Sequence, residues 1–546
     1  MLLILITSIL LLPTLLGLGK LFGNVFKTEI FEGMSGKIVF GIFGISLVWT
    51  VLAFFIPLNL YVEIPTILLG LFYFFKEKLY QEFYQFSGKE LSLLTIGSLI
   101  ILFCSSFYPY ILDHFGYYFP SIQWLKEYGL VKGISNLDLI LGQMSVWHIF
   151  QAGFSNFADP FLRINSVLLI VYLLYIIEKK TWIQLCFSPI LLLFSQSPSP
   201  DLPVIVFSLL ILNEIVSGNK KTSLIFAFSV FVFVIKPTMI WLPIFSFLYS
   251  IFIVKSCLKT LIPGIFILLL FCFKNIWTFG YPVFPVSILD LGFSWKPNAE
   301  LLKSSSKFAI LKTFDNQYSY EEILKFSWLD YIKNWLLLNG IKSIINILFI
   351  ISLIVFIIYA FIKKNKIFTF VCISLVIKSI LVLAFSAQYR FFIDVFFVIF
   401  FVSFLHKISK RKALIIYSFL NLFFIGFLCF PNSIHVYLPS FRPSQFMGQF
   451  ELKQLYKPST YENKKFHSFQ VGNLKFNVSE KYPFNFDTSL PAISESFIFD
   501  YQKAGIFPQL IDKNDIRKGF FSKKTSPEEQ KQVEKAINTI KNSYKF

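Results

Sequence analysis

Long apolar stretches recur along the whole chain and are separated by short polar connections. They lie at residues 1–18, 36–57, 62–76, 91–112, 163–178, 182–196, 202–217, 222–235, 239–254, 260–274, 341–362, 367–386, 391–405 and 413–430. A helix needs roughly 20 apolar residues to cross a hydrocarbon core of about 30 Å, and the stretches recur at that spacing. The pattern predicts an all-α polytopic membrane protein with about 14 transmembrane helices. Strand-like alternation is absent, which argues against an outer-membrane barrel.

The composition excludes a soluble enzyme. Of the 546 residues, 55% are hydrophobic and 15% are charged, 71 are Phe, and the mean hydropathy is +0.67. Soluble domains carry roughly 25% charged residues. The six cysteines fall in or at the edge of apolar stretches and form no CxxC pair, so neither a disulfide framework nor a zinc site is expected. No Gly-rich phosphate cradle occurs, so ATP and nicotinamide cofactors are not expected.

The charge of the chain bears on its topology. Lys and Arg total 50 against 31 Asp and Glu, a formal net charge of +19, which in a soluble protein would suggest a nucleic-acid partner. Here the basic residues cluster in every second connection between apolar stretches. The clusters are Lys20, Lys27 and Lys37; Lys76, Lys78 and Lys89; Lys179 and Lys180; Lys220 and Lys221; Lys255 and Lys259; Lys363, Lys364 and Lys366; and Lys407, Lys410, Arg411 and Lys412.

Short cytoplasmic loops accumulate Lys and Arg, so this alternation predicts that the clustered loops are cytoplasmic and that both termini lie on the opposite side. Because the loops account for the positive charge, no nucleic-acid partner is expected. Helical spans with this bias predict a multi-pass protein of the bacterial inner (cytoplasmic) membrane, in contact with the lipid bilayer.

Three non-cytoplasmic segments are too long to be simple connectors: residues 113–162, 275–340 and 431–546. In the first, residues 121–129 and 139–154 are amphipathic and too short or too polar to span, so they are expected to lie at the membrane interface. The last is richer in Lys, Asn, Ser and Pro. We expect N-terminal transmembrane helices at 1–90, a transmembrane core with the large loops at 91–430, and a small extracytoplasmic α/β domain at 431–546.

Ionisable residues gather at the predicted non-cytoplasmic ends of the helices. Asp113 and His114 follow the fourth apolar stretch, and Asp201 opens the seventh. Lys236 closes the eighth, and Lys274 closes the tenth. Arg390 opens the thirteenth, with Asp394 four residues on, close enough along a helix to pair with it.

A charge at membrane depth costs on the order of 2.5–3.5 kcal/mol, so such residues need a partner, a watery cavity or an interface to which they snorkel. Snorkelling explains any single Lys or Arg of this set. Gathered cations with a carboxylate also suit an anionic lipid phosphate, whose charged group lies at the membrane surface. The carboxylate would act as a general base on an acceptor hydroxyl, and the cations would neutralise the phosphate charge that grows in the transition state.

These features resemble the GT-C superfamily of polyprenyl-phosphate-dependent membrane glycosyltransferases. The string from Asp113 to Gly133, with Asn136-Leu137 and Trp147 after it, resembles multi-spanning bacterial proteins of surface-polysaccharide type. The later motif of those proteins is matched by Gly280-Tyr281-Pro282, Asp290 and Trp295. The acidic loop follows the first span in other members of the superfamily, whereas here it follows the fourth apolar stretch, so three stretches are added before it.

The resemblance implies roles for particular residues. Asp113 matches the first-loop carboxylate that serves as base or metal ligand, and His114 takes the place of a second acidic or polar group. The chain thus departs from the paired-acid form of the motif, which leaves a divalent metal as an open alternative, and no other cofactor is implied. Candidate substrate-binding residues are Tyr117, Tyr118, His148, Asp201, Lys236, Lys274, Tyr281 and Arg390, of which Lys236, Lys274 and Arg390 are candidates for the lipid phosphate. For the aromatic residues, membrane anchoring is the simpler interpretation.

The implied reaction is an inverting transfer of a sugar from a polyprenyl-phosphate carrier to an extracytoplasmic glycan or lipid acceptor. One alternative is an enzyme like the O-antigen polymerases and ligases, which would depend on Arg or His in a late loop and not on Asp113. Another is a transporter or flippase of lipid-linked glycans, for which polar residues near the bilayer midplane are typical. Lys378 and the prolines at 237, 243 and 263 are the obvious interruptions, and no internal repeat is found.

Overall fold

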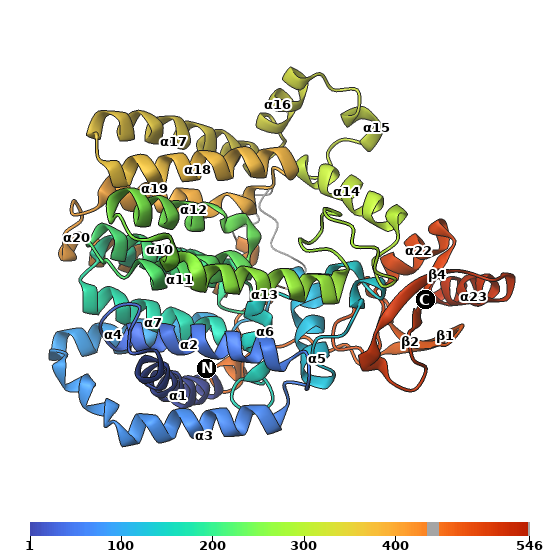
Figure 1. Ribbon diagram of the computed structural model, residues 1–546, viewed down its shortest axis with the longest axis horizontal. Coiled ribbons are helices and arrows are strands. Elements are labelled where there is room, and N and C mark those ends of the chain that lie inside the picture. The colour runs from blue at the N-terminus through green and yellow to red at the C-terminus, as the bar shows by residue number, and fades with distance from the viewer. Residues whose placement is uncertain (434–446, 544–546) are drawn as a thin grey trace.

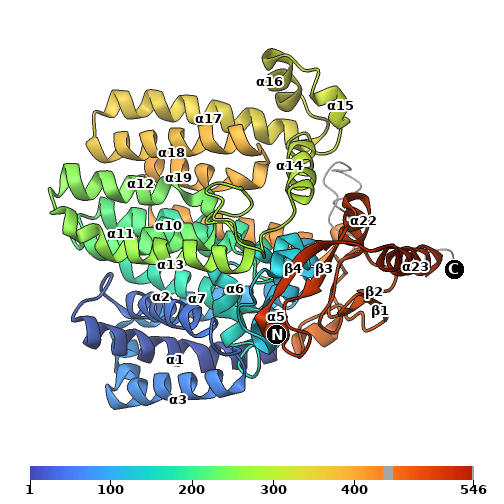
Figure 2. The same cartoon turned by 45° about the vertical axis from the view of Figure 1, so that its right-hand side comes forward.

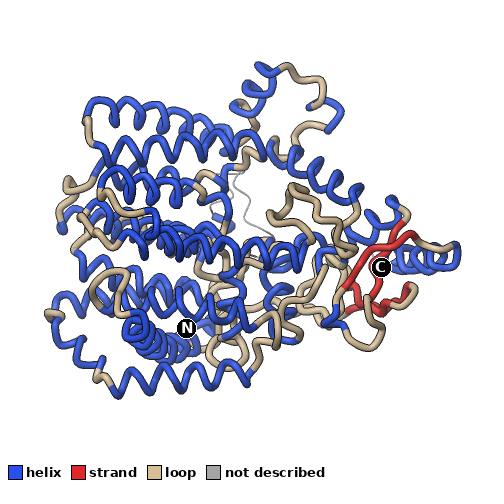
Figure 3. Tube along the Cα trace, viewed as in Figure 1, coloured by secondary structure: helices blue, strands red, loops and turns tan. Residues whose placement is uncertain are grey.

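The computed structural model describes residues 1–433 and 447–543. Most of this chain is helical, and the four strands lie together near the C-terminus (Figure 3). Every predicted apolar stretch contains helix. The principal elements are α1 (Leu2–Phe26), α2 (Met34–Leu52), α3 (Leu60–Lys76), α4 (Gly88–Ser105), α7 (Ile164–Lys179), α8 (Trp182–Leu185), α9 (Ser188–Leu191), α10 (Asp201–Val216), α11 (Thr222–Ile235), α12 (Trp241–Leu248), α13 (Ile262–Phe279), α17 (Ile341–Lys363), α18 (Lys366–Phe385), α19 (Ile393–Phe404) and α20 (Lys410–Cys429).

Seven helices of the described chain are long and apolar enough to cross a membrane. They are α1, α2, α4, the continuous helical segment Leu258–Phe279 that contains α13, α17, α18 and α20. The other apolar segments are shorter helices or pairs of short helices, such as Thr222–Ile235 and Ile393–Phe404. This is a helical membrane protein, and the full number of crossings stays a prediction.

The helices form a layered bundle whose long connections meet at one end (Figures 1 and 2). The segments around α5 (Phe119–Glu127) and α14 (Ala299–Thr313) lie at that end, together with the C-terminal strands. The lysine-bearing turn between α17 and α18 lies at the opposite end. The long connections and this lysine-bearing turn therefore lie at opposite ends of the bundle.

Small residues allow the N-terminal helices to pack closely. A Cβ atom on Gly17 of α1 would lie 1.8 Å from the carbonyl oxygen of Gly70 in α3, and one on Gly41 of α2 would lie 2.2 Å from the carbonyl oxygen of Leu15. Any larger side chain would force these helices apart. Such small-residue contacts are typical of helices that associate within a membrane.

The segment between α4 and α7 is buried in the protein. All eight residues of α6 (Val146–Gly153) are buried, and so are Trp124 and Leu125 of α5. The apolar faces of residues 121–129 and 139–154 pack against the helices of the bundle rather than against lipid, and their expected place at the membrane interface stays a prediction. Beneath them, the carboxylate of Glu63 accepts hydrogen bonds from the backbone N–H groups of residues 156–158 at 2.7–3.0 Å.

The segment between α13 and α17 folds into a helical lobe, residues 299–340. It contains α14, α15 (Tyr320–Ile323) and α16 (Trp328–Leu336), and Figure 1 shows it beside the end of the bundle from which α17 starts. Ser319 and Ser327 begin α15 and α16 with capping boxes.

The described part of the C-terminal region is small and mixed, as predicted, although residues 434–446 of the expected domain lie outside the described residues. Its elements are β1 (Phe466–Val471), β2 (Leu474–Ser479), α22 (Glu495–Ala504), β3 (Ile506–Leu510), β4 (Phe520–Lys524) and α23 (Pro527–Ser543). Antiparallel pairing joins β1 to β2 and β3 to β4 in two separate sheets.

Buried polar contacts fasten this region to the loop before α6. The carboxylate of Asp138 accepts hydrogen bonds from Ser494 Oγ at 2.8 Å and Asn485 Nδ2 at 3.1 Å. Tyr501 donates to the backbone carbonyl of Asn136 at 2.8 Å. The region is therefore packed on the bundle rather than connected only by its chain.

A buried arginine, Arg163, also links the C-terminal region to the bundle. Its guanidinium is fully buried and donates to the carbonyl oxygens of Ser105 at 2.9 Å, Phe161 at 2.7 Å, Phe107 at 3.3 Å and Ser459 at 2.8 Å. These carbonyls lie at the end of α4, in the loop before α7 and in the C-terminal region. One side chain thus satisfies backbone groups from three distant segments.

We expect Arg163→Met to lower the free energy of unfolding by about 3–5 kcal/mol, because several buried carbonyls would lose their donors at about 1–3 kcal/mol each. The measurement is thermal unfolding of the purified protein in detergent. Arg163→Lys is the matched control, since it keeps the charge but offers donors from a single point. Its unfolding temperature should lie between those of the parent and Arg163→Met. An unfolding temperature of Arg163→Met equal to that of the parent would contradict this role.

Burial also raises the pKa of the Asp138 carboxyl to about 7, against the hydrogen bonds from Ser494 and Asn485. The folded protein therefore retains a proton that the unfolded chain releases near pH 3.8, and stability falls as the pH rises from that value toward 7. The Asp138→Asn variant stays neutral at all pH values. We expect its free energy of unfolding to rise by a few kcal/mol relative to that of the parent as the pH increases from 5 to 8. Unfolding temperatures of variant and parent that remain parallel across this range would contradict the prediction.

Candidate functional site

An ion pair joins two of the predicted site residues across the fold. The guanidinium Nη1 of Arg390 lies 2.6 Å from the carboxylate of Asp113. Arg390 precedes α19 and Asp113 precedes α5, so the pair links positions 277 residues apart. The two side chains are 44% and 33% exposed, which leaves both accessible. The expected pairing of Arg390 with Asp394 is wrong, because Asp394 faces α18 inside the bundle.

A second ion pair lies beside the first. Lys236, at the end of α11, pairs with Asp201, the first residue of α10, and Asp201 also accepts a hydrogen bond from Ser199 Oγ at 3.1 Å. The ring of Phe391 contacts both cations, with its centroid 5.3 Å from Lys236 Nζ and 5.1 Å from the Arg390 guanidinium. We call Asp113, Asp201, Lys236, Arg390 and Phe391 the helix-end cluster.

The helix-end cluster carries two positive and two negative charges and is formally neutral. Asp201 and Tyr118 act electrostatically on the Arg390 guanidinium together with Asp113. The sequence pointed to the four charged members. Phe391 was missed, because an aromatic residue that opens an apolar helix looks like any lipid-facing side chain.

A buried aromatic layer lies next to the cluster. The ring centroids of Tyr117 and Tyr118 each lie 4.9 Å from that of His148. Burial is the main cause that lowers the pKa of both His114 and His148 to about 3, so both imidazoles are neutral at pH 7. A neutral histidine cannot contribute a cation to phosphate binding.

Two predicted residues lie apart from the cluster's contacts. Lys274 is fully buried and donates to the backbone carbonyls of Gln143 and Met144, which fastens the loop before α6 to α13. Tyr281 packs on Phe279, with ring centroids 5.3 Å apart, in a hydrophobic cluster with Leu139. Both positions have packing roles in this structure.

A buried ion pair that the sequence did not single out as a site lies deeper in the bundle. Lys378 of α18 pairs with Asp394 of α19, and Trp241 Nε1 donates to the same carboxylate at 3.0 Å. The Lys378 side chain has no exposed surface, and that of Asp394 is 6% exposed. This pair fixes the start of α19, four residues after Arg390.

The motifs that carry the resemblance meet in space. Asn136 Nδ2 donates to the carbonyl of Trp295 at 2.6 Å, and Ser522 of β4 donates to Asn136 Oδ1 at 2.7 Å. The ammonium of Lys132 lies 4.9 Å from the Trp295 ring centroid. These residues form the joint between the two long loops and the C-terminal region, which is an architectural role.

Within residues 1–433 and 447–543, no three His, Cys, Asp or Glu side chains gather in a way that would hold a metal ion. Asp113 as a metal ligand stays a prediction, and its carboxylate binds Arg390 here.

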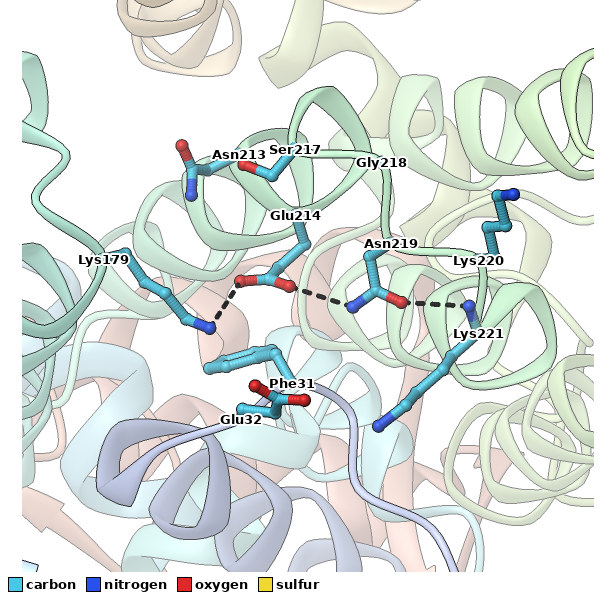
Figure 4. Close-up of a pocket in the computed structure, with 10 residues that line it drawn as sticks. All are labelled: Phe31, Glu32, Lys179, Asn213, Glu214, Ser217, Gly218, Asn219, Lys220 and Lys221. Carbon is cyan, nitrogen blue, oxygen red and sulfur yellow. Dashed lines mark hydrogen bonds and ion pairs between the residues drawn. The ribbon is translucent and has the colours of Figure 1, made fainter.

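A hollow of about 620 Å³ lies at the other end of α7 and α10 (Figure 4). Glu214 accepts a hydrogen bond from Asn219 at 2.9 Å and lies 3.7 Å from Lys179 Nζ. Lys221 donates to the Glu29 carbonyl at 2.9 Å. These contacts hold the connection between α1 and α2 against the turn between α10 and α11, so the charged lining serves packing.

A family model described as a domain of unknown function (DUF8201) matches residues 1–397. The chain belongs to this family. The match includes every member of the helix-end cluster. No curated protein matches the chain, and no solved structure matches it.

We expect Lys378→Met to be strongly destabilising, by about 3–5 kcal/mol, because it leaves the Asp394 carboxylate buried without its cation. Adding Asp394→Asn should recover much of the loss. Arg390→Gln should cost no more than about 1 kcal/mol, since its ion pair is half-exposed. Unfolding temperatures of the three variants in detergent check these expectations, and equal losses for Lys378→Met and Arg390→Gln would refute them.

Proposed function

We propose that this protein transfers a sugar from a polyprenyl-phosphate carrier to an extracytoplasmic glycan or lipid acceptor at the bacterial inner membrane. The observation that supports this most directly is the half-exposed pair of Asp113 and Arg390 at one end of the bundle. The neighbours of the pair, Leu112 and Tyr389, are exposed apolar side chains. A charged pair with apolar surroundings suits a ligand that is part phosphate and part hydrocarbon.

In the resting state proposed here, Asp113 occupies the position on Arg390 that a phosphate would take. A guanidinium binds carboxylate and phosphate oxygens with the same planar donors, so the two compete. Phosphate binding at Arg390 therefore releases the Asp113 carboxylate. The base becomes available only when the donor is present.

The released carboxylate then takes the proton of the acceptor hydroxyl as its oxygen attacks the anomeric carbon. The bond from that carbon to the phosphate oxygen breaks, and its electron pair leaves with the polyprenyl phosphate. Direct displacement inverts the configuration at the anomeric carbon. Arg390 stabilises the charge that develops on the phosphate, and Lys236, whose Nζ lies 5.3 Å from the Phe391 ring centroid, contributes a second cation.

Asp201 and the buried aromatic residues are proposed to support this arrangement. Asp201 holds Lys236 in place. Tyr117, Tyr118 and His148 exclude water from the inner side of the cluster, and neutral His114 adds no charge to it. Lys274 and Tyr281 position the adjoining loops through their packing contacts.

The proposed topology has all fourteen apolar segments crossing, with the helix-end cluster and the C-terminal region on the non-cytoplasmic side. Several shorter segments, such as α7, α10 and α11, are almost completely buried. Protein rather than lipid surrounds these helices, so their length need not match the hydrocarbon thickness closely.

One observation favours a second candidate, a transporter or flippase of lipid-linked glycans. The Lys378–Asp394 pair is buried between helices, and ionisable residues at membrane depth often mark a transport pathway. The glycosyltransferase proposal requires the Asp113 carboxylate, whereas the transporter proposal requires the buried pair. An O-antigen ligase-like enzyme would instead require Arg390 without Asp113.

The test is Asp113→Asn in the native host, with the surface-glycan profile and the membrane level of the protein measured together. We expect loss of a glycan product at an unchanged protein level, because the amide keeps the shape of the side chain but takes up no proton. General-base catalysis contributes about 10²–10⁴-fold, so the residual transfer should be small.

Asp512→Asn is the matched control. Asp512 is 32% exposed and pairs with Lys518 at 2.7 Å, much as Asp113 pairs with Arg390, but it lies in the C-terminal region. Its glycan profile should equal that of the parent. An unchanged profile in Asp113→Asn would exclude the carboxylate from the chemistry, and loss in Arg390→Gln alone would then favour the ligase-like enzyme.

A further inference from the structure

The outer side of α16 is apolar although nothing in the described chain covers it. Trp328, Leu329 and Ile332 are 72%, 59% and 48% exposed. At 3.6 residues per turn, these positions form one continuous stripe. The exposed charged residues Asp330 and Lys333 lie on a separate face. A helix with a lipid-like stripe beside a charged face is typical of the plane of a membrane interface.

The side of α16 next to the stripe is firmly anchored. Trp335 is buried and its Nε1 donates to the carbonyl of Ala387 at 2.8 Å. The ring of Tyr331 packs on that of Phe314, with centroids 4.8 Å apart. The exposed stripe therefore belongs to a helix that is fixed along the adjoining side, and it is not a loose segment whose apolar residues simply lack a partner.

The stripe continues into a surface that faces lipid. α17 begins a few residues after α16, and it is one of the helices long enough to cross a membrane. Its exposed residues Ile344, Leu348, Ile351 and Val355 follow a helical spacing along its length. Leu324 and Leu337, on either side of α16, are also exposed. The apolar surface of α17 and that of the lobe thus adjoin at the end of the bundle.

We infer that the lobe of residues 299–340 docks on the lipid surface at the Asp113 end of the bundle, with the Trp328–Ile332 stripe of α16 immersed at the boundary between headgroups and acyl chains. The partner is the bilayer itself. Continuity with the lipid-facing side of α17 places the stripe beside hydrocarbon, and Lys333 extends from the other face toward the headgroups.

This docking bears on the helix-end cluster, a consequence that rests on the proposed function. Ala387, which accepts the Trp335 hydrogen bond, lies three residues before Arg390, and its N–H donates to Thr313 Oγ1 of α14 at 3.2 Å. Lys342 pairs with Asp315 of the lobe and lies 5.7 Å from the Tyr389 ring centroid. A lobe resting on the lipid surface would hold Arg390 at headgroup depth, where a lipid phosphate lies.

The test uses cysteine labelling of the full chain. Trp328→Cys and Ile332→Cys are each labelled with an environment-sensitive fluorophore after replacement of the exposed Cys257 by Ser. The protein is reconstituted in vesicles of phosphatidylethanolamine and phosphatidylglycerol that contain a lipid with a nitroxide on its acyl chain. The background is the same protein without an added cysteine. Two stripe positions keep the test informative if one variant fails to fold.

Lys333→Cys is the matched control on the same helix. We expect the labels at 328 and 332 to be quenched by the nitroxide lipid at least about twice as strongly as the label at 333, and iodide in the buffer to show the reverse order. Equal access of iodide to all three positions would overturn the inference. Labels at 328 and 332 shielded from both quenchers would also overturn it, because a protein would then cover the stripe.

The readout needs no transfer activity. Lipid quenching at α16 together with an unchanged glycan profile in Asp113→Asn would support the docking surface and reject the proposed chemistry. The opposite combination would reject the docking surface alone.

Discussion

The fold depends on hydrogen bonds to backbone carbonyls that are buried at the end of α4, in the loop before α7 and in the C-terminal region. Water cannot satisfy them, and an unpaired buried carbonyl is costly. The Arg163 guanidinium supplies the donors for four of them at once, 2.7–3.3 Å away. Its contact with Ser459 draws the C-terminal region onto the bundle. The loop that carries Asp113 starts from this fixed point.

The positions of the helices could be predicted from the sequence, because an apolar stretch in a membrane protein must form its backbone hydrogen bonds within itself. The charged members of the helix-end cluster were also identified, since a charge beside an apolar stretch is conspicuous. Their pairing was not. Arg390 was expected to bind Asp394 within one turn of helix, yet it binds Asp113, which is 277 residues away in the chain. Pairing of distant residues depends on tertiary packing that no local pattern encodes.

Amphipathic segments show a second limit of sequence patterns. Residues 139–154 and α16 both combine apolar and polar positions, but α6 is wholly buried in protein and α16 exposes its stripe. An apolar face in the sequence indicates only that something apolar covers it. Whether the cover is another helix or lipid depends on the fold. Similarly, the sequence places Lys378 within an apolar stretch, but only the fold shows that it pairs with Asp394.

The contact between Arg163 and Ser459 has a consequence for biosynthesis. The two residues are separated by 296 positions, and the ribosome makes the chain from its N-terminus. When α4 and α7 have already been made, Arg163 still lacks one acceptor, and Asn136 and Asp138 lack their partners from the C-terminal region. Until residues 447–543 emerge, the end of the bundle that carries Asp113 is incomplete. Assembly of this end of the bundle therefore waits until these residues have been made, and a chain interrupted before them leaves buried polar groups for quality control to detect.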